Sequence, residues 1–473
     1  MDSSESGNRK KGFWNFIDNI EGDKIVWIIV FMLIIFSILA IFSSTPLLAL
    51  QQNTDRISIM KEQIAIVAVG LGIIFGLYSI RKIGVFRIIS QLGFIGSLIL
   101  LIFLVFNIDI PGVIESQNLN EAQRPLKVFK FQIHVYEVVK VAMIMYLAWA
   151  LNAYRKDLEA MDQGQESGTL WILNRIGRNR NFAFLKLPLW KRIFYLYMPI
   201  AITAVMIMPG SNSSMLFISV IMVATLLLGG LPMKEILTTA AIGVAVIGIG
   251  MSIYFATDGK FLKPVFGRIE TAVTRMTMDI DPDIAMAGLT PGTPAYDKKL
   301  GRIQQPNAAL IAIHEGGLTG KGPGNSTQKY AVPVMFGDYI FSFLVEEYGL
   351  LGGIFIIILY VSLLARGSTI SRNCDNQFAK TAVGGLSLLI SGQAFMHMMV
   401  NVGIGPLTGQ TLPLISHGSS SFLMFSVAFG IILSISRMAK QKIQEEQLAA
   451  KPIYESERDD IQAALDTIEE IDS

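Results

Sequence analysis

Ten apolar segments of 17 to 27 residues dominate this 473-residue sequence and limit the folds that it can adopt. A helix rises about 1.5 Å per residue, so about 20 apolar residues cross the hydrocarbon core of a bilayer. The chain is 52% hydrophobic and only 16% charged, as is typical of polytopic membrane proteins. We therefore predict an all-α polytopic membrane protein with about ten transmembrane helices. The segments are residues 25–43, 63–80, 88–106, 135–152, 193–209, 213–231, 235–255, 339–365, 381–401 and 420–437.

The fifth segment has the weakest pattern. It contains Pro199 and ends at Pro209, and proline inside a span leaves backbone carbonyls unpaired. We expect this span to be short, tilted or re-entrant.

Lysine and arginine predict the orientation of the spans, because these residues gather in cytoplasmic loops. With ten spans, most of them fall on the side of the basic N-terminus, whereas residues 402–419 carry none. We therefore expect both termini in the cytoplasm, with 1–22 as an N-terminal segment, 23–438 as the membrane domain and 439–473 as a tail. Residues 257–337 then form a large extracytoplasmic loop between spans seven and eight. The basic residues are Arg81, Lys82, Arg87, Arg155, Lys156, Arg175, Arg178, Arg180, Lys186, Lys191, Arg192, Arg366, Arg372, Lys380, Arg437, Lys440 and Lys442.

Charge and cysteine content exclude several classes of function. A net charge of +2 gives no basic surface for nucleic acid, so we expect no nucleic-acid partner. The single cysteine, Cys374, excludes an intrachain disulfide and a cysteine-ligated metal cluster. The four histidines lack the i, i+4 spacing of a metal-binding helix. We predict no cofactor, and a requirement for a divalent cation stays open.

Asp338 is the first candidate for chemistry, because it stands where a long polar loop meets an apolar span. An ionisable group at a lipid–water boundary is costly to hold dry and is a candidate functional group. As a general base it would take a proton at the outer surface, in an apolar neighbourhood. The alternative is a helix N-cap that accepts hydrogen bonds from the amides of Ile340 or Phe341.

Glu346 and Glu347 lie about two turns inside the same segment. If the helix includes residue 338, Glu346 lies roughly 80° around it from Asp338 and Glu347 roughly 180°. Glu346 is then expected to share the groove of Asp338, and Glu347 to meet another helix or a buried cation.

Two further groups carry charge. Glu137 and Lys140 are spaced i, i+3 near the outer end of span four, which allows an ion pair; alternatively, Lys140 faces an anionic substrate group and Glu137 orients it. The glycine-rich stretch Gly316–Gly322 contains Lys321 and could present amides and an ammonium to a phosphate. On its own, this stretch is better interpreted as a flexible hinge.

Four motifs stand in a fixed order. The first joins Asp23 and Lys24 to Phe42-Ser43-Ser44 and Lys61-x-Gln63; the second is A-I-H-E-G-G-L-T-G-K-G at 312–322. The third is G-D-Y-I-F at 337–341 with E-E-x-G-L-x-G at 346–352; the fourth is Asn401-x-Gly403, Thr408-Gly409 and L-P-L-I-S-H-G-S-S at 412–420. Each is weak alone, but together they resemble the SEDS family (shape, elongation, division and sporulation) of ten-span peptidoglycan glycosyltransferases, over roughly residues 20 to 440.

The resemblance implies a reaction and roles. Asp338 matches the proposed catalytic base of the family, which would accept the proton of an acceptor sugar hydroxyl as it attacks the donor. Both substrates would be lipid II, and the product a glycan strand at the outer face of the bacterial cytoplasmic membrane. Lys321 and Lys140, and more weakly Arg124, are candidates to stabilise the departing pyrophosphate. The implied partners are a class B penicillin-binding protein and other division or elongation proteins.

The chain departs from the family pattern near these residues. The family motif Q-P-S-E is here His134-Val135-Tyr136-Glu137, and P-E-x-H-T before the aspartate is residues 333–337, P-V-M-F-G. Three hypotheses follow. The first is a polymerising glycosyltransferase, most like the cell-division type, with the elongation and sporulation types left open. The second is a lipid II flippase or transporter, and the third is a catalytically impaired scaffold.

Overall fold

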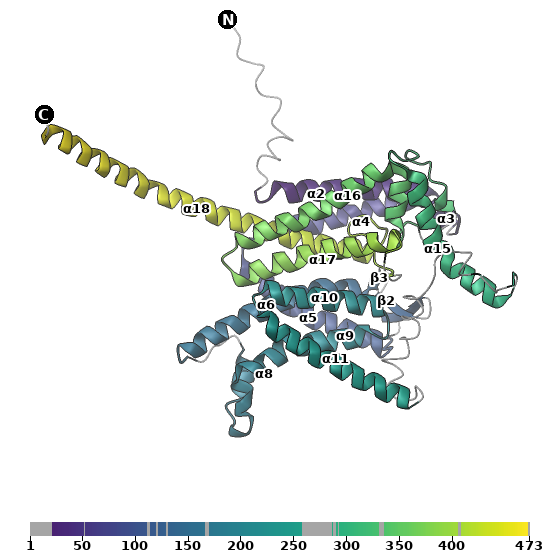
Figure 1. The fold of residues 1–473 in the computed structure, drawn as a ribbon, viewed down its shortest axis with the longest axis horizontal. Helices are drawn as coiled ribbons and strands as arrows, with labels where there is room; N and C mark the ends of the chain where they lie inside the picture. Colours follow the sequence, from purple (N-terminus) through teal and green to yellow (C-terminus); the bar gives the residue numbers. More distant parts are fainter. Residues whose placement is uncertain are drawn as a thin grey trace, which may run out of the picture.

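The chain folds into a helical bundle (Figure 1). The computed structural model describes residues 21–471 apart from 52, 111–113, 120–121, 129–130, 166–169, 258–285, 287–289, 292, 331–334 and 405–407. The helices are α2 (Lys24–Ser44), α3 (Pro46–Gln51), α4 (Arg56–Tyr78), α5 (Ile83–Val105), α6 (Val135–Asp162), α7 (Trp171–Ile176), α8 (Pro188–Arg192), α9 (Met198–Ile207), α10 (Asn212–Leu228), α11 (Met233–Ala256), α15 (Pro294–Gly316), α16 (Ile340–Arg372), α17 (Gln377–Asn401) and α18 (Ser419–Ile471).

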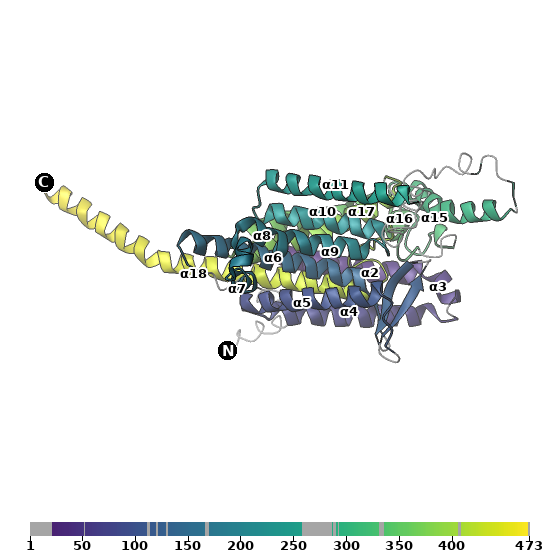
Figure 2. The same ribbon diagram turned by 90° about the horizontal axis from the view of Figure 1, so that it is seen from below.

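Each of the ten predicted segments contains helix. Within the described residues, eight helices or helical stretches are long and apolar enough to cross a membrane, and α10 is a shorter apolar helix. α11 occupies the seventh predicted segment and runs beside α10 in Figure 2. The fifth segment forms one helical stretch, Pro188–Ile207, in which a π-helical turn at Ile193–Tyr197 joins α8 to α9. The chain is therefore an all-α polytopic membrane protein.

A sheet and several helices, of which α15 is the longest, were not predicted. A three-stranded antiparallel sheet of β1 (Ile114–Leu119), β2 (Ala122–Val128) and β3 (Phe131–His134) precedes α6. The later part of the predicted 257–337 loop contains α15, although that segment carries an internal proline, Pro306. The earlier part of that loop, and the N-terminal segment up to residue 20, lie outside the described residues.

The two ends of the bundle differ (Figures 1 and 2). We call the end that carries the sheet, α3 and α15 the sheet end, and the opposite end, from which α18 extends, the tail end. Because α2 begins and α18 leaves the bundle at the tail end, both parts of the chain lie on the same side of the spans.

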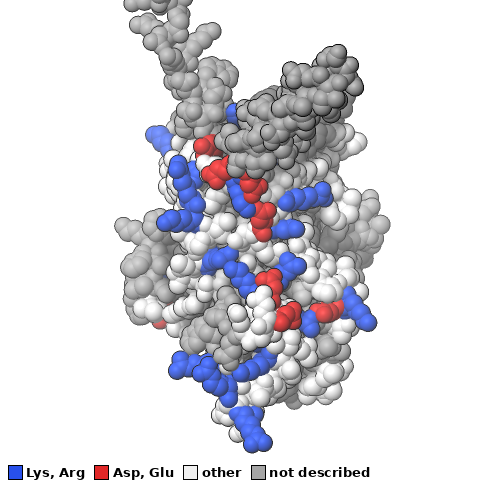
Figure 3. Space-filling model, turned by 90° about the vertical axis from the view of Figure 1, so that its left-hand side faces the viewer, with Lys and Arg blue, Asp and Glu red and all other residues white. Residues whose placement is uncertain are grey.

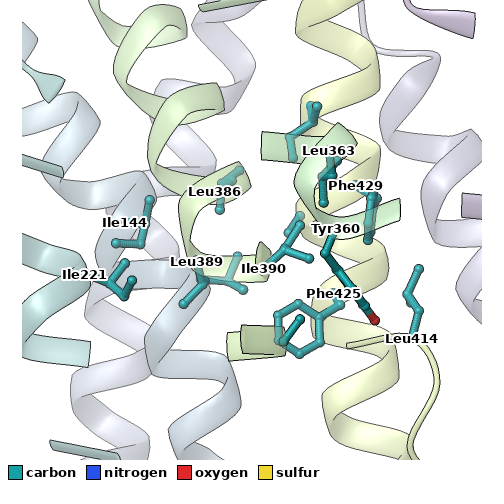
Figure 4. Packing of buried hydrophobic residues seen from close by; sticks show 14 of the residues in the cluster. Ile144, Ile221, Tyr360, Leu363, Leu386, Leu389, Ile390, Leu414, Phe425 and Phe429 are labelled. Carbon is teal, nitrogen blue, oxygen red and sulfur yellow. The ribbon is translucent and has the colours of Figure 1, made fainter. Parts of the chain in front are cut away.

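α17 occupies the centre of the packing shown in Figure 4. Its Leu386, Leu389 and Ile390 are fully buried. They pack between Ile144 and Ile221 on one side and the large side chains of α16 and α18 on the other. Inside a bilayer, close van der Waals packing holds such side chains together, so this core fixes α16, α17 and α18 relative to one another. The α16 and α18 side chains in this view include Tyr360, Leu363, Phe425 and Phe429.

Candidate functional site

Asp338 lies on a turn at the sheet end, two residues before α16 begins. Its side chain is half-buried. Three successive carbonyl oxygens of this turn accept hydrogen bonds from other parts of the chain, so the backbone that carries the carboxyl group has a defined position. The donors are the His417 amide to Phe336 O (3.0 Å), the Ser416 hydroxyl to Gly337 O (2.9 Å) and the Asn401 side-chain amide to Asp338 O (3.0 Å).

The start of α16 corrects two expectations. Tyr339, not Asp338, holds the N-cap position and makes no side-chain cap hydrogen bond, so the N-cap alternative for Asp338 is wrong. In the first turn of α16, Asn401 Oδ1 instead accepts hydrogen bonds from the amide (3.0 Å) and the hydroxyl (2.8 Å) of Ser342. The angular argument that placed Glu346 beside Asp338 assumed one helix from residue 338, and it does not apply.

The segment 410–418 holds the Asp338 turn and is itself strained. Leu414 has φ +60°, a left-handed conformation that costs a non-glycine residue about 1–2 kcal/mol. Hydrogen bonds from two spans offset this cost: the Tyr360 hydroxyl donates to Pro413 O (2.6 Å) and the Ser37 hydroxyl to Ile415 O (3.2 Å). Strain of this kind persists where the surroundings impose it, and it gathers at functional sites.

His417 connects the turn to α4. The Ser37 hydroxyl donates to Ile415 O, so it must accept from Gln63 Nε2 (3.0 Å), and the amide oxygen of Gln63 then faces His417 Nδ1 (3.1 Å). The ring of His417 therefore carries its proton on Nδ1. The rings of His417 and Phe336 pack edge to face, with centroids 5.6 Å apart. Burial lowers the pKa of His417, and the nearby Glu62 carboxylate partly offsets this, so the imidazole is neutral at pH 7.

Lys140 lies at the centre of a buried polar network at the same end. Its side chain is 1% exposed, and its ammonium donates to Glu137 Oε1 (2.7 Å), Gln393 Oε1 (2.7 Å) and Gln410 Oε1 (2.8 Å). The i, i+3 ion pair that the spacing allows is thus formed. The main-chain carbonyl of Gln410 also contacts His397 Nδ1 (2.7 Å), one turn before Asn401 on α17. The network and the Asp338 turn are therefore held by the same helix.

The glycine-rich stretch is a fixed part of the fold, so the interpretation as a flexible hinge is wrong. α16 is broken at Gly349 (φ +71°), and the stretch pairs with the backbone on both sides of the break. The pairs are Lys321 N to Glu346 O (2.9 Å), Gly322 N to Glu347 O (2.9 Å), Leu350 N to Gly317 O (2.9 Å) and Leu351 N to Leu318 O (3.2 Å). A Cβ at Gly320 would lie 2.2 Å from Glu347 O, so only glycine allows this approach.

Glu346 is fully buried, and its carboxylate is surrounded by donors of this stretch and the residues after it. The donors are Lys321 Nζ (2.8 Å), the Ser326 hydroxyl, the Thr327 amide (2.8 Å) and hydroxyl (3.0 Å), and the Gln328 amide (3.4 Å). Lys321 also pairs with Glu315, and this hydrogen bond lowers the pKa of Glu315. Burial lowers the pKa of Lys321, but its bonds to Glu315 and Glu346 outweigh this, so the net shift is upward and the group stays charged.

Glu347 points to a different set of partners. It accepts from the Ser43 hydroxyl of α2 (2.6 Å) and the Gly324 amide (3.0 Å), and Lys329 Nζ lies 3.9 Å away. This confirms that Glu347 meets another helix and a buried cation. The carboxylates of the E-E motif therefore join α2, α16 and the glycine-rich stretch, and the Ser43 contact explains why the first motif belongs with the third.

The candidate cations are occupied in this structure. An ammonium has three N–H donors, and three acceptors lie within bonding distance of Lys140 and of Lys321. A substrate phosphate would have to replace one of these acceptors. Arg124 lies in β2, and its side chain is outside the described part of the structure. Side chains of α17 bond both the Asp338 turn and Lys140, the partner of Glu137, at the sheet end. Glu346 and Lys321 form a separate cluster at the break in α16.

Several residues that hold the site were not singled out as functional candidates. Asn401, Gln393, Gln410 and Ser416 form the hydrogen bonds that fix the Asp338 turn and the ammonium of Lys140. Asn401 and Ser416 do belong to the fourth motif. A buried amide in an apolar helix needs a partner, and this signal could have found Gln393. Gln410 lies between α17 and α18, outside any helix.

Comparison with known proteins gives concordant matches. The family model described as "Cell cycle protein", FtsW/RodA/SpoVE, matches residues 23–441. A protein of Hahella chejuensis, named probable peptidoglycan glycosyltransferase FtsW, is 40% identical over 151 residues, which are 31% of this chain and 38% of that protein. A protein of the same name from Pseudomonas fluorescens is 25% identical over 412 residues, or 86% of each chain.

A solved structure shares the fold. A chain described under "Structural coordination of polymerization and crosslinking by a peptidoglycan synthase complex" matches with a TM-score of 0.58 and 17% identity, over 88% of this chain and 98% of that one. The match of the family model over most of the chain shows that this chain belongs to the FtsW/RodA/SpoVE family of cell cycle proteins.

Proposed function

We propose that this protein is a peptidoglycan glycosyltransferase that polymerises lipid II at the outer face of the bacterial cytoplasmic membrane, with Asp338 as general base. The observation that carries the proposal is the Asp338 turn. The carboxyl group is half-buried at the end of a span, on a backbone held by three hydrogen bonds from other segments, and this supports a role as proton acceptor. The names of the aligned relatives support the same activity.

The chemistry is a displacement at the anomeric carbon of the donor sugar. Asp338 takes the proton of the acceptor hydroxyl while the oxygen of that hydroxyl attacks the anomeric carbon. The bond between this carbon and the undecaprenyl pyrophosphate breaks. The leaving group takes the electron pair of that bond, so cationic or N–H donors that stabilise its charge accelerate the step. Lys140 and Lys321 remain the candidates, and each would exchange one present acceptor for a phosphate oxygen.

The orientation and partners belong to the same proposal. The concentration of basic residues at the tail end favours the cytoplasm on that side, so that the sheet end faces outward and both termini lie inside. A class B penicillin-binding protein would crosslink the new strand. The structural relative supports this partner, because it comes from a peptidoglycan synthase complex that coordinates polymerization and crosslinking.

Labelled lipid II separates the three hypotheses. The purified full chain, with and without its transpeptidase partner, should convert it to glycan ladders, and the Asp338→Ala variant should give none. Movement of lipid II across vesicles without polymer would favour a transporter, and neither polymer nor movement would favour a scaffold. Repeating the reaction with EDTA tests whether a divalent cation is required.

A further inference from the structure

A cavity opens at the tail end, far from the Asp338 turn. It lies between the start of α2, the end of α16 and the part of α18 that leaves the bundle, and has a volume of about 390 Å³. Its lining combines cations with apolar side chains. The charged lining residues are Asp23, Lys24, Arg366 and Lys440, and the large apolar ones are Ile25, Ile370 and Ile443.

The single carboxylate of the lining is already engaged. Asp23 Oδ1 caps α2 by accepting from the amides of Ile25 (3.0 Å) and Val26 (3.2 Å), and Oδ2 accepts from Arg366 Nε (2.7 Å) and Nη2. A guanidinium has five N–H donors, so Arg366 has more of them than this carboxylate uses. Lys24 and Lys440 are exposed. The lining therefore carries three positive charges against one negative charge.

The two spans α2 and α16, which line the cavity, also carry exposed apolar side chains. Ile25 is 44% exposed, and Ile28, one turn further along α2, is 55% exposed. On the neighbouring α16, Val361 and Ile358 are about half exposed, at 48% and 52%. A ligand with an anionic group and hydrocarbon chains fits this combination better than a free anion does.

We propose that this cavity binds the headgroup of an anionic phospholipid, with the acyl chains lying along the exposed apolar side chains of α2 and α16. Basic pockets between spans on the cytoplasmic side of a membrane are suited to such headgroups. The whole tail end supplies a favourable field, because Lys and Arg side chains spread over it around a smaller group of carboxylates (Figure 3). The proposal depends on the membrane fold and the cavity, and not on the activity at Asp338.

Native mass spectrometry of the full chain tests the proposal. The protein is reconstituted in nanodiscs with equal phosphatidylglycerol and phosphatidylcholine and released in detergent, and the ratio of the two lipids retained is measured. We expect phosphatidylglycerol to be retained in preference. The Lys24→Gln/Lys440→Gln variant should lose this preference by about fivefold for each lysine removed.

Lys82→Gln/Lys442→Gln is the matched control, because it removes the same charge at the tail end from residues that do not line the cavity. It should retain the native ratio. Equal retention of both lipids by the native protein would overturn the proposed site. So would an equal loss of the preference for phosphatidylglycerol in the two double variants. A shift in Tm with inorganic phosphate as large as that with phosphatidylglycerol vesicles would also overturn it, because the hydrocarbon chains would then contribute nothing.

Discussion

We expect His417, which holds the Asp338 turn, to make the stability of the fold depend on pH. Burial lowers its pKa, whereas the unfolded chain takes up the proton near the usual value of about 6.5. Unfolding therefore binds a proton below pH 6.5, and stability falls as the pH falls, by at most about 1.4 kcal/mol per pH unit. We expect the Tm of the native protein to fall more between pH 7.5 and 5.5 than that of His417→Asn, which keeps an N–H for Gln63 but does not titrate. Identical pH profiles would refute the role of His417.

The two carboxylates of the E-E motif should contribute differently to the stability of the fold. Glu346 accepts five hydrogen bonds, one of them from Lys321, whereas one oxygen of Glu347 has no partner among the described residues. Loss of the charge on Glu346 leaves Lys321 with one of its two carboxylate partners. Glu346→Gln should therefore lower the thermal unfolding temperature in detergent clearly more than Glu347→Gln does. The reverse order would show that the donors around Glu346 do not hold the break in α16.

Sequence reasoning found the chemical groups but not how they are held. Asp338, Glu346 and Lys140 stand out because charge in an apolar segment is costly wherever the helix begins. The angle between Asp338 and Glu346 could not be obtained in this way, because α16 begins only at Ile340 and an amide from α17 takes the place of a local cap. Which amide meets which carbonyl depends on segments far apart in the chain.

The glycine-rich stretch and the break in α16 act as one unit. Substitutions at two glycines can distinguish close packing from backbone conformation as the reason for glycine there. Gly320 and Gly324 both have φ +82°, but a Cβ at Gly320 would lie 2.2 Å from Glu347 O, whereas a Cβ at Gly324 would meet nothing within 4 Å. Gly324→Ala should cost only the left-handed conformation, about 1–2 kcal/mol. Gly320→Ala adds a clash with backbone and should cost more than about 4 kcal/mol. Chemical denaturation measures both, and equal losses would mean that close packing is not the reason for glycine at 320.

The elements that sequence reasoning missed have physical reasons for being hard to see. A long apolar helix is a local property of its residues, so the ten segments were found. α15 contains Pro306, which is normally a helix breaker, and the strands gain their stability from pairing across the sheet. Glycine content alone could not separate a hinge from a close approach of two backbones, which is why the stretch at 316–322 was misjudged.

The bundle as a whole has a basic end and an end that carries the candidate site. If the tail end is cytoplasmic, an impermeant maleimide should label an Asp55→Cys variant in spheroplasts, and a Lys442→Cys variant only after the membrane is permeabilised. Both are made in a Cys374→Ser background, so that the introduced cysteine is the single thiol; burial raises the pKa of Cys374 to about 11, which disfavours its thiolate. Labelling of Lys442→Cys in sealed spheroplasts would invert the orientation.

The rate of glycan polymerisation by Asp338→Asn, relative to Asp55→Asn, tests the proposed reaction most directly. Both changes replace a carboxylate by an amide of the same shape at the sheet end, but Asp55 is exposed at the start of α4 and its side chain makes no cap hydrogen bond. Loss of a general base should slow the reaction by about 10²–10⁴-fold, with Asp55→Asn unchanged. Polymerisation by Asp338→Asn at the native rate would contradict the assignment of Asp338 as the proton acceptor.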